Sequence, residues 1–489
     1  MRHPLGVLWF LACAGDPELP EPVEELPEAP ELLQGSPLLA RISLDLIGRR
    51  PTQVELQRLR EDPEELPILV DEYLDDPDFA GRMAWIWNDS FHTAVFADDY
   101  QRFGELSTER RRAMGMAPLM MVSLIVEQDL PFSTLVTSQQ LAGQEVLADF
   151  YPIEGASTEW GWVESTDGRP MAGVLSSTSL WLRYSADATN YHRARANAVS
   201  RLLLCSDFLE RDAGFEFALQ PEALTNVEEA VWNEGACLTC HAALDPLGAA
   251  FGGFAEKSDS LPAEQYLRWS AMQDAWQTAQ LQPTYYGVPA TLDEMGPLIA
   301  QDPRFSRCVV QRFHEGLVGV APEPLQHDAL TRDFVEQGLV ARDLVRTILF
   351  SEAYQDAELR PLTNEQLASS LSASLGLPLE GGPLEELVWD PDLRVLSGGT
   401  DDVSVLQRSG APSPGREAAL WWAAQQAVGV TALVDEEADA SAEITRLYRI
   451  LLSAEPSPET LAGLEALHAS DGWEGVLEAL IRHPMGQLH

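Results

Sequence analysis

The sequence of 489 residues contains almost no lysine and little positive charge of any kind. Its 32 basic residues face 77 acidic residues, which gives a net charge of −45 at pH 7, and Lys257 is the only lysine. Such a negative chain repels phosphate backbones and anionic lipids, so nucleic-acid binding is not expected. A positively charged protein partner or a divalent cation is the natural electrostatic match.

Long apolar runs and alternating, strand-like patterns are also scarce. Beyond the N-terminus no segment has the roughly 18 uninterrupted apolar residues of a spanning helix. From Pro37 onward the apolar residues recur at helical spacing, and 489 residues are too many for one core. The sequence therefore predicts an all-α, multidomain helical array. Its predicted parts are residues 1–12 (signal peptide), 13–36 (tether), 37–155 (N-terminal helical domain), 156–360 (second helical domain) and 361–489 (C-terminal helical domain with a loop at 397–414).

Local signals predict where several helices begin. Residues 52–55 (TQVE) have the pattern of a capping box, and residues 363–366 (TNEQ) repeat it. Ser457 stands before Pro458, which is typical of an N-cap with proline in the first turn. The Gly/Ser/Pro-rich stretch at 397–414 predicts a surface loop. Aromatic residues at helical spacing around Trp87 predict a buried helix face.

The N-terminus has the pattern of an export signal. A short positive start is followed by an apolar run at 5–11 and by Ala12-Cys13, which resembles a bacterial lipoprotein signal with Cys13 as the lipidated residue. Phe10 departs from that pattern, and plain export or an N-terminal anchor is the alternative. The Pro/Glu-rich residues 16–30 cannot bury a core and predict an extended tether. We expect an exported protein of the bacterial periplasm or outer membrane, attached through a lipid anchor.

The chain has only five cysteines, and two of them belong to one short motif, Cys237-Leu-Thr-Cys240-His241. Two thiols three residues apart, followed at once by an imidazole, form the pattern of covalent haem attachment. Chance produces it on the order of once in a thousand such chains. A thioredoxin-like redox pair is not favoured, because no strand pattern precedes the motif. A structural zinc site is not favoured either, because the chain has no second Cys/His pair at suitable spacing. A disulfide within the motif is the remaining alternative.

Cys205 and Cys308 are left once Cys13 and the motif are assigned. In an oxidising compartment they can pair and close a loop of about 100 residues. Two separate buried thiols are the alternative.

Several segments resemble the planctomycete-type cytochrome c proteins, a multidomain family whose accompanying helical domains are of unknown function. The resemblance rests on LLARISLDLIGRRPTQVEL and LVDEYLDDPDFAGRMAWIWND near the start, on RARANAVSRLLLC and on CLTCHAALDPLGAAFGGF. It implies an exported, mainly helical protein with an embedded cytochrome c-like module and one covalent haem c. The segment CLTCHAALDPLG is the most specific part of the likeness.

Carried over to this chain, the resemblance makes Cys237 and Cys240 the thioether donors and His241 the proximal iron ligand. The resemblance also implies a turn after the motif, formed by Asp245, Pro246 and Gly248. Asp-Pro and Gly on their own predict a helix stop at the same place. The chain departs from the family at Leu244, where many relatives have methionine. Residues 252–254 (GGF) also replace the usual Glu-Asn-Phe-Asp run.

The sequence does not identify the distal iron ligand. Met295, Met272 and His192 are candidates, and each has a structural alternative as a packed side chain. Our leading hypothesis is a mono-haem periplasmic electron-transfer lipoprotein with a basic redox partner. A haem-dependent redox enzyme subunit and a haem-free surface scaffold are the rivals. No nucleophile–base pair, phosphate loop or flavin fingerprint in the sequence supports an independent active site.

Overall fold

A computed structural model describes residues 32–487, except 96–105, 149, 186–191, 211–234, 255–281, 357–359, 411–412, 430–432 and 436. Of the described residues, 63% are helical and 4% lie in strands, so the chain is mostly helical and multidomain, as predicted. Cys13, Met272, the predicted signal peptide and most of the predicted tether lie outside these residues. Within the described part, no helix has the length and hydropathy needed to cross a membrane.

The chain begins with a group of short helices around one helical hairpin corner. Gly48 ends α1 in the left-handed conformation (φ 67°), which glycine adopts at little cost. Thr52 and Glu55 then form the predicted capping box at the start of α2, which is confirmed. The elements are α1 (Gly35–Ile47), α2 (Gln53–Glu61), η1 (Pro63–Glu65), α3 (Leu66–Leu74) and α4 (Asp78–Phe91).

A long central helix and a small sheet follow. α5 (Thr108–Glu127) is buried on most of its surface and packs against α4 and β1. Strands β1 (Leu141–Gly143), β3 (Gly161–Ser165) and β2 (Ile153–Glu154) form an antiparallel sheet in that order, with Leu141 opposite Val163. A second hairpin pairs β4 (Thr284–Tyr285) with β5 (Val288–Pro289). These two small sheets are the departure from the predicted all-α class.

Short and medium helices build the middle of the chain. They are α6 (Thr134–Thr137), α7 (Glu145–Ala148), η3 (Gly173–Ser176), α8 (Thr178–Arg183), α9 (Arg193–Leu204), α11 (Gly235–Ala249), α13 (Leu292–Gln301), α14 (Pro303–Val318), α15 (Pro324–Glu336), α16 (Ala341–Leu349) and α17 (Glu352–Gln355). An aromatic cluster joins α4, the segment before α6 and α14. The centroid of the Trp87 ring lies 5.0 Å from that of Phe132 and 6.0 Å from that of Phe313.

Within the described residues, the C-terminal part consists of helices joined by loops. Thr363 and Gln366 form the predicted capping box of α18, and Ser457 caps α23 before Pro458, so both expected helix starts are confirmed. The helices are α18 (Asn364–Leu375), α19 (Glu386–Trp389), α20 (Pro391–Leu396), α21 (Pro414–Val428), α22 (Ala440–Leu452), α23 (Pro458–Ile481) and α24 (Pro484–Gln487).

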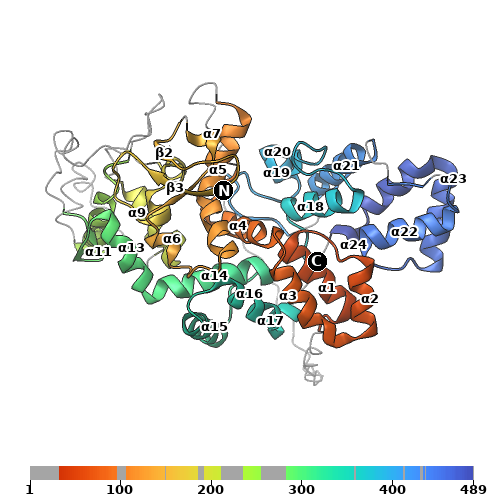
Figure 1. The fold of residues 1–489 in the computed structure, drawn as a ribbon, viewed down its shortest axis with the longest axis horizontal. Coiled ribbons are helices and arrows are strands. Elements are labelled where there is room, and N and C mark those ends of the chain that lie inside the picture. Colours follow the sequence, from red (N-terminus) through yellow and green to blue (C-terminus); the bar gives the residue numbers. More distant parts are fainter. Residues whose placement is uncertain are drawn as a thin grey trace, which may run out of the picture.

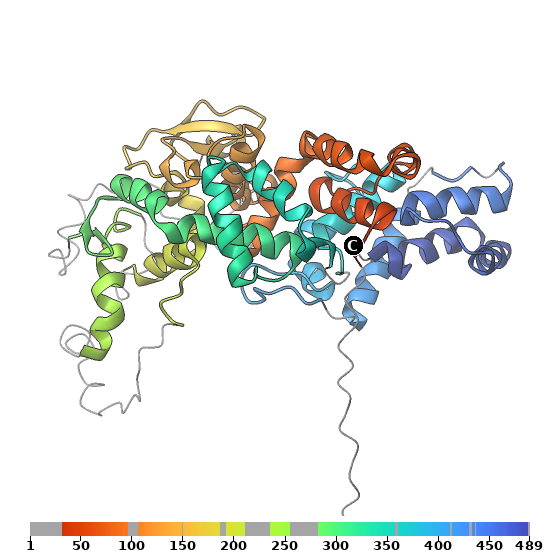
Figure 2. The same ribbon diagram turned by 90° about the horizontal axis from the view of Figure 1, so that it is seen from below.

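Two large hydrophobic clusters organise the fold. One gathers side chains between Leu38 and Tyr354, and the other joins Leu44 to side chains between Leu362 and Ile481. In Figures 1 and 2 the C-terminal helices α21 to α23 form one end of the molecule and α11 lies at the opposite end. The second cluster begins close to the predicted boundary at 360, whereas the first cluster crosses residue 155. The domain boundaries stay a prediction.

Cys205 and Cys308 form a disulfide, with their Cα atoms 5.2 Å apart. Cys205 directly follows α9 and has a left-handed backbone (φ 47°), while Cys308 lies buried within α14. The bond joins residues 103 positions apart in the sequence. It therefore fixes α9, which precedes the predicted haem-attachment motif, against α14, which follows it.

The predicted surface loop at 397–414 is not a surface loop along its whole length. Ser397, Thr400 and Asp402 are at most 1% exposed, and α21 already begins at Pro414. The cause is one buried carboxylate. Asp402 accepts hydrogen bonds from Asn88 Nδ2 and Val95 N, each at 3.0 Å, which tie the loop to the end of α4.

The ionisation of Asp402 makes the stability of the fold depend on pH. Burial on its own raises the pKa of Asp402, but the hydrogen bond from His92 and the charge of Arg394 outweigh burial and lower the pKa to about 2. Since an unfolded aspartate titrates near ~3.9, the ionised group contributes stability that is fully present above about pH 4. This contribution is lost as the pH falls through about 2.

We expect Asp402→Ala to lower the free energy of unfolding by about 3 kcal/mol at pH 7, because buried donors lose their acceptor. Denaturant unfolding at pH 7 and near pH 2 measures the effect. The difference in unfolding free energy between wild type and variant should be smaller near pH 2 than at pH 7. Exposed Asp392 is the matched control, and its alanine variant should change stability by less than about 0.5 kcal/mol. An Asp402 variant as stable as this control would contradict the tie between loop and α4.

Candidate functional site

The predicted haem-attachment motif lies on α11, at one end of the molecule (Figure 1). Its helical spacing puts positions 237, 240 and 241 on one face, because residues three and four apart are neighbours on a helix. For residues 235–239 the structure describes the backbone alone, so the side chain of Cys237 lies outside the description. α11 packs against α9 and β4.

Cys240 and His241 are partly accessible on this helix. Cys240 is a free cysteine, half-buried, with its Sγ 3.9 Å from the carbonyl oxygen of Phe208. The side chain of His241 is 21% exposed. A thiol and an imidazole on adjacent residues thus stand at the edge of the hydrophobic core rather than inside it.

A buried carboxylate orients the imidazole. Asp245 follows His241 by one helical turn, and its Oδ1 lies 3.0 Å from His241 Nδ1. Arg193, at the start of α9, donates to the same carboxylate through Nε at 2.6 Å and Nη2 at 2.8 Å. A carboxylate that accepts the Nδ1 proton leaves the lone pair on Nε2, which is the tautomer that a histidine needs to bind a metal through Nε2.

Asp245 is ionised at neutral pH. Its side chain is only 1% exposed, and burial alone raises its pKa. The hydrogen bonds and charges of Arg193 and His241 outweigh burial, so the pKa lies below its ordinary value. The carboxylate therefore keeps its negative charge next to the imidazole throughout the physiological range.

The turn predicted at Asp245, Pro246 and Gly248 is wrong, because α11 continues through all three residues to Ala249. Proline costs one backbone hydrogen bond within a helix, yet Pro118 and Pro297 also lie inside helices of this chain. The side chain of Asp245 binds Arg193 and His241, so it does not fold back to end the helix. Tertiary contacts thus overrode the local helix-stop signal.

Two arginines at this site were not predicted. Besides Arg193, the buried Arg195 donates from Nη1 to the carbonyl oxygens of Phe251 and Phe254, at 3.2 and 3.1 Å. These bonds fix the segment that follows α11 onto α9. The sequence RAR at 193–195 marks a basic helix start, but nothing local indicates a partner 52 residues away.

The distal-ligand candidates lie in different surroundings. His192 is fully buried before α9, next to the arginine that binds Asp245, and its Nδ1 is 3.0 Å from Arg195 Nη1. Met295 is fully buried on α13, which packs tightly on α6: a Cβ at Gly296 would lie 2.1 Å from the carbonyl oxygen of Val136. The assignment of either as an iron ligand stays a prediction.

The residues present fit a covalently bound haem in the chemistry of their donors. Cys240 supplies a free thiol, and His241 supplies an imidazole whose Nδ1 is already engaged by Asp245. In the part of the chain that the structure describes, no three His, Cys, Asp or Glu side chains gather as a metal-binding group. The described donors are thus one thiol and one oriented imidazole.

We expect Asp245→Asn to destabilise the site by about 2–3 kcal/mol at pH 7, because it leaves Arg193 beside a neutral group in a buried setting. The folded pKa of Asp245 is lowered, so its contribution is present above the unfolded value near ~3.9 and disappears in acid. Hydrogen exchange of residues 240–254 measures the local loss. Asp333→Asn, which disrupts an exposed pair with Arg332, is the control and should have little effect. Unchanged protection in the Asp245 variant would contradict this role.

Residues 24–196 match a family model described as PSCyt2, a protein of unknown function (DUF1549). This domain is associated with planctomycete cytochromes c, and the matched segment ends before residues 237–241. No curated protein and no solved structure matches the chain. The resemblance is therefore confirmed for the N-terminal part of the chain: residues 24–196 are similar to a planctomycete cytochrome-c-associated domain.

Proposed function

We propose that this chain is an exported c-type haem protein that carries single electrons between periplasmic partners. Cys237 and Cys240 hold the porphyrin through two thioether bonds, and His241 is the proximal ligand. When bound, the haem supplies a one-electron Fe(III)/Fe(II) couple. The observation that carries the proposal is the His241–Asp245 contact of 3.0 Å beside the free thiol of Cys240, within a complete attachment motif.

The neighbouring residues have distinct roles in this proposal. Asp245 orients the imidazole and, as an anion, strengthens its donation to a metal, which favours the oxidised state. Arg193 keeps that buried carboxylate ionised through two hydrogen bonds. The Cys205–Cys308 disulfide fixes the end of α9, the helix on which α11 packs. His192 or Met295 is proposed as the distal ligand.

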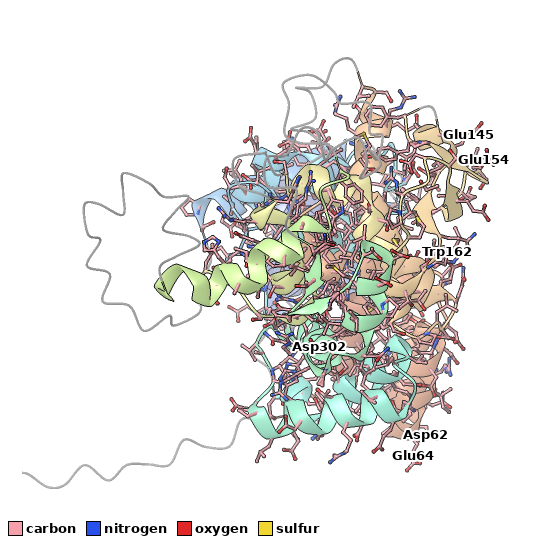
Figure 3. All side chains as sticks on the ribbon, turned by 90° about the vertical axis from the view of Figure 1, so that its left-hand side faces the viewer. Asp62, Glu64, Glu145, Glu154, Trp162 and Asp302 are labelled. Atoms are coloured by element: carbon pink, nitrogen blue, oxygen red, sulfur yellow. A yellow bond between two sulfur atoms is a disulfide. The ribbon has the colours of Figure 1, made fainter. Side chains whose placement is uncertain are left out.

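The partner we propose is a positively charged redox protein. The net charge of −45 provides long-range attraction, which speeds encounter with a basic partner at low ionic strength. Figure 3 looks onto the end that carries α11 and labels Glu145 and Glu154, which belong to α7 and β2. Both side chains are exposed. These acidic side chains add to the negative charge that would attract a basic partner.

Export and anchoring belong to the same proposal. Cys13 would be lipidated after cleavage, and the Pro/Glu-rich residues up to 36 would tether the folded part to the membrane. Covalent haem attachment to this motif takes place outside the cytoplasm in bacteria, so the signal and the motif support each other. The N-terminal match to a cytochrome-associated domain is a third, independent support.

Carbon monoxide binding distinguishes an electron carrier from a haem enzyme. The ferrous protein, matured with the c-type attachment machinery, should bind carbon monoxide slowly or not at all if His192 or Met295 closes the sixth position. Rapid binding would favour a haem-dependent redox enzyme subunit. Separate His192→Ala and Met295→Ala variants identify the distal ligand, since only the variant that opens the iron should bind rapidly.

A further inference from the structure

A second polar site lies far from α11, in a cavity between the two hydrophobic clusters. The cavity has a volume of about 520 Å³ and is lined by α4 from the first cluster and by residues near α18 and 406–410 from the second. Figure 1 shows α4 and α18 near the centre of the molecule, away from α11. Its volume falls within the range of small-molecule sites, roughly 300–1,000 Å³.

One face of α4 supplies the cavity wall. Arg82, Trp85, Ile86 and Asp89 follow at intervals of three, one and three residues, the spacing of a single helix face. Met83, Trp87 and Phe91 lie on the opposite face and are fully buried in the core. One face of α4 is therefore packed in the core, and the other face presents Arg82, Asp89 and two apolar side chains to the cavity.

Arg82 carries the argument, because it is a buried cation with unused donors. It is only 7% exposed, and neither its Nε nor its Nη1 has a hydrogen-bond partner among the described residues. Glu365, Asp45 and Asp89 act on its charge, but a buried donor without a hydrogen-bond partner still costs about 1–3 kcal/mol. Nearly all buried polar groups in proteins are paired, so an unsatisfied guanidinium on a cavity wall indicates a ligand that pairs with it.

The other charges in the cavity define what that ligand can be. Arg408 is engaged by Asp89 at 2.8 Å and by Glu365 at 3.3 Å, and Arg360 donates to the carbonyl oxygen of Leu317 at 2.7 Å. Arg360 Nε and Arg408 Nη1 nevertheless also lack partners among the described residues. Three of the arginines that line the cavity thus each have at least one buried nitrogen without a hydrogen-bond partner.

A single negative charge fits this arrangement best. The planar guanidinium matches a carboxylate in a two-bond geometry. The same cavity is also lined by four carboxylates, which would repel a second negative charge on a ligand: Asp45, Asp89, Glu315 and Glu365. Trp85 and Ile86 offer an apolar wall three and four residues along from Arg82. The side chain of Asp89 is 39% exposed, so the cavity reaches solvent at that point.

We propose that this cavity binds a small organic monocarboxylate, with the carboxylate on Arg82 and the apolar body against Trp85 and Ile86. The ligand would bridge the two hydrophobic clusters, so its binding stabilises the folded chain. This site needs neither the haem motif nor export, and it is independent of the proposed electron transfer.

Titration of the full chain with benzoate, benzamide and inorganic phosphate tests the proposal, by calorimetry and by thermal unfolding. Benzoate should bind and raise the unfolding temperature at concentrations up to about 10 mM. Benzamide, its neutral analogue, and phosphate, which carries more charge, should bind at least about tenfold more weakly. No binding of benzoate, or equal binding of the amide or of phosphate, would overturn the proposal.

Arg82→Gln separates a binding role from a structural one. It should weaken benzoate binding at least about tenfold and abolish the benzoate-induced rise in unfolding temperature, while unfolding without ligand reports the separate cost of losing the charge beside Glu365. Arg332→Gln makes the same change in net charge at an exposed position and should bind benzoate like wild type. If Arg82→Gln does not fold, Arg82→Lys keeps the charge without the planar fork and should also weaken binding. Unchanged binding in the folded Arg82 variant overturns the assignment.

Discussion

Replacing Cys237 and Cys240 together by alanine should remove all covalently attached haem from the protein. Each thioether needs its own thiol, and His241 alone retains haem only by coordination, which denaturation breaks. We expect haem staining of the denatured chain to fall from a strong band to background. Each single variant should keep at most one thioether, with a reduced yield.

The control for this experiment is the other cysteine pair. Cys205→Ala/Cys308→Ala removes the same number of sulfur atoms but leaves the motif intact, so the chain should still carry covalent haem if it folds. Equal haem staining in the motif variant and this control would contradict attachment at Cys237 and Cys240. Staining lost only in the motif variant supports it.

Removal of the Cys205–Cys308 disulfide should produce the largest loss of stability of any substitution considered. The bond closes a loop of 103 residues, and in the chain-entropy model such a cross-link contributes about 4–5 kcal/mol. The loop includes α11 and α13, so removal of the bond should also lower the local stability around residues 237–241. We expect Cys205→Ala/Cys308→Ala to unfold at lower denaturant concentration than the oxidised wild type.

Denaturant unfolding with and without a reductant measures this contribution. Reduced wild type should resemble the double variant, while the Cys240→Ala variant should retain most of the wild-type stability because its half-buried thiol is not cross-linked. A double variant with unchanged stability would show that the two sulfur atoms are not joined in the folded protein. Near-equal results in oxidised and reduced wild type would lead to the same conclusion.

Local features of the fold could be predicted from the sequence because their causes are local. The capping boxes at Thr52 and Thr363 and the N-cap at Ser457 each depend on residues within one helical turn. The buried face of α4 around Trp87 follows from helical spacing in the same way. The opposite face, with Arg82 and Asp89, has the same spacing but faces a cavity that only the folded chain creates.

Long-range contacts explain what could not be predicted. His241 and Asp245 are four residues apart on a helix, so their contact follows from spacing, whereas Arg193 reaches Asp245 across 52 residues. Asp402 and Asn88 meet across 314 residues, and this contact buries a loop whose composition predicts exposure. A charged partner at such a distance changes burial without any local signal in the sequence.

The haemochrome spectrum of the mature protein tests the central claim most directly. The full chain, produced together with c-type attachment machinery, is denatured in alkaline pyridine and reduced, and its absorption reports how many vinyl groups have been converted to thioethers. We predict one haem per chain with both vinyl groups converted, and haem that stays with the protein after acid extraction. A chain without covalent haem under these conditions would contradict the proposed cytochrome function.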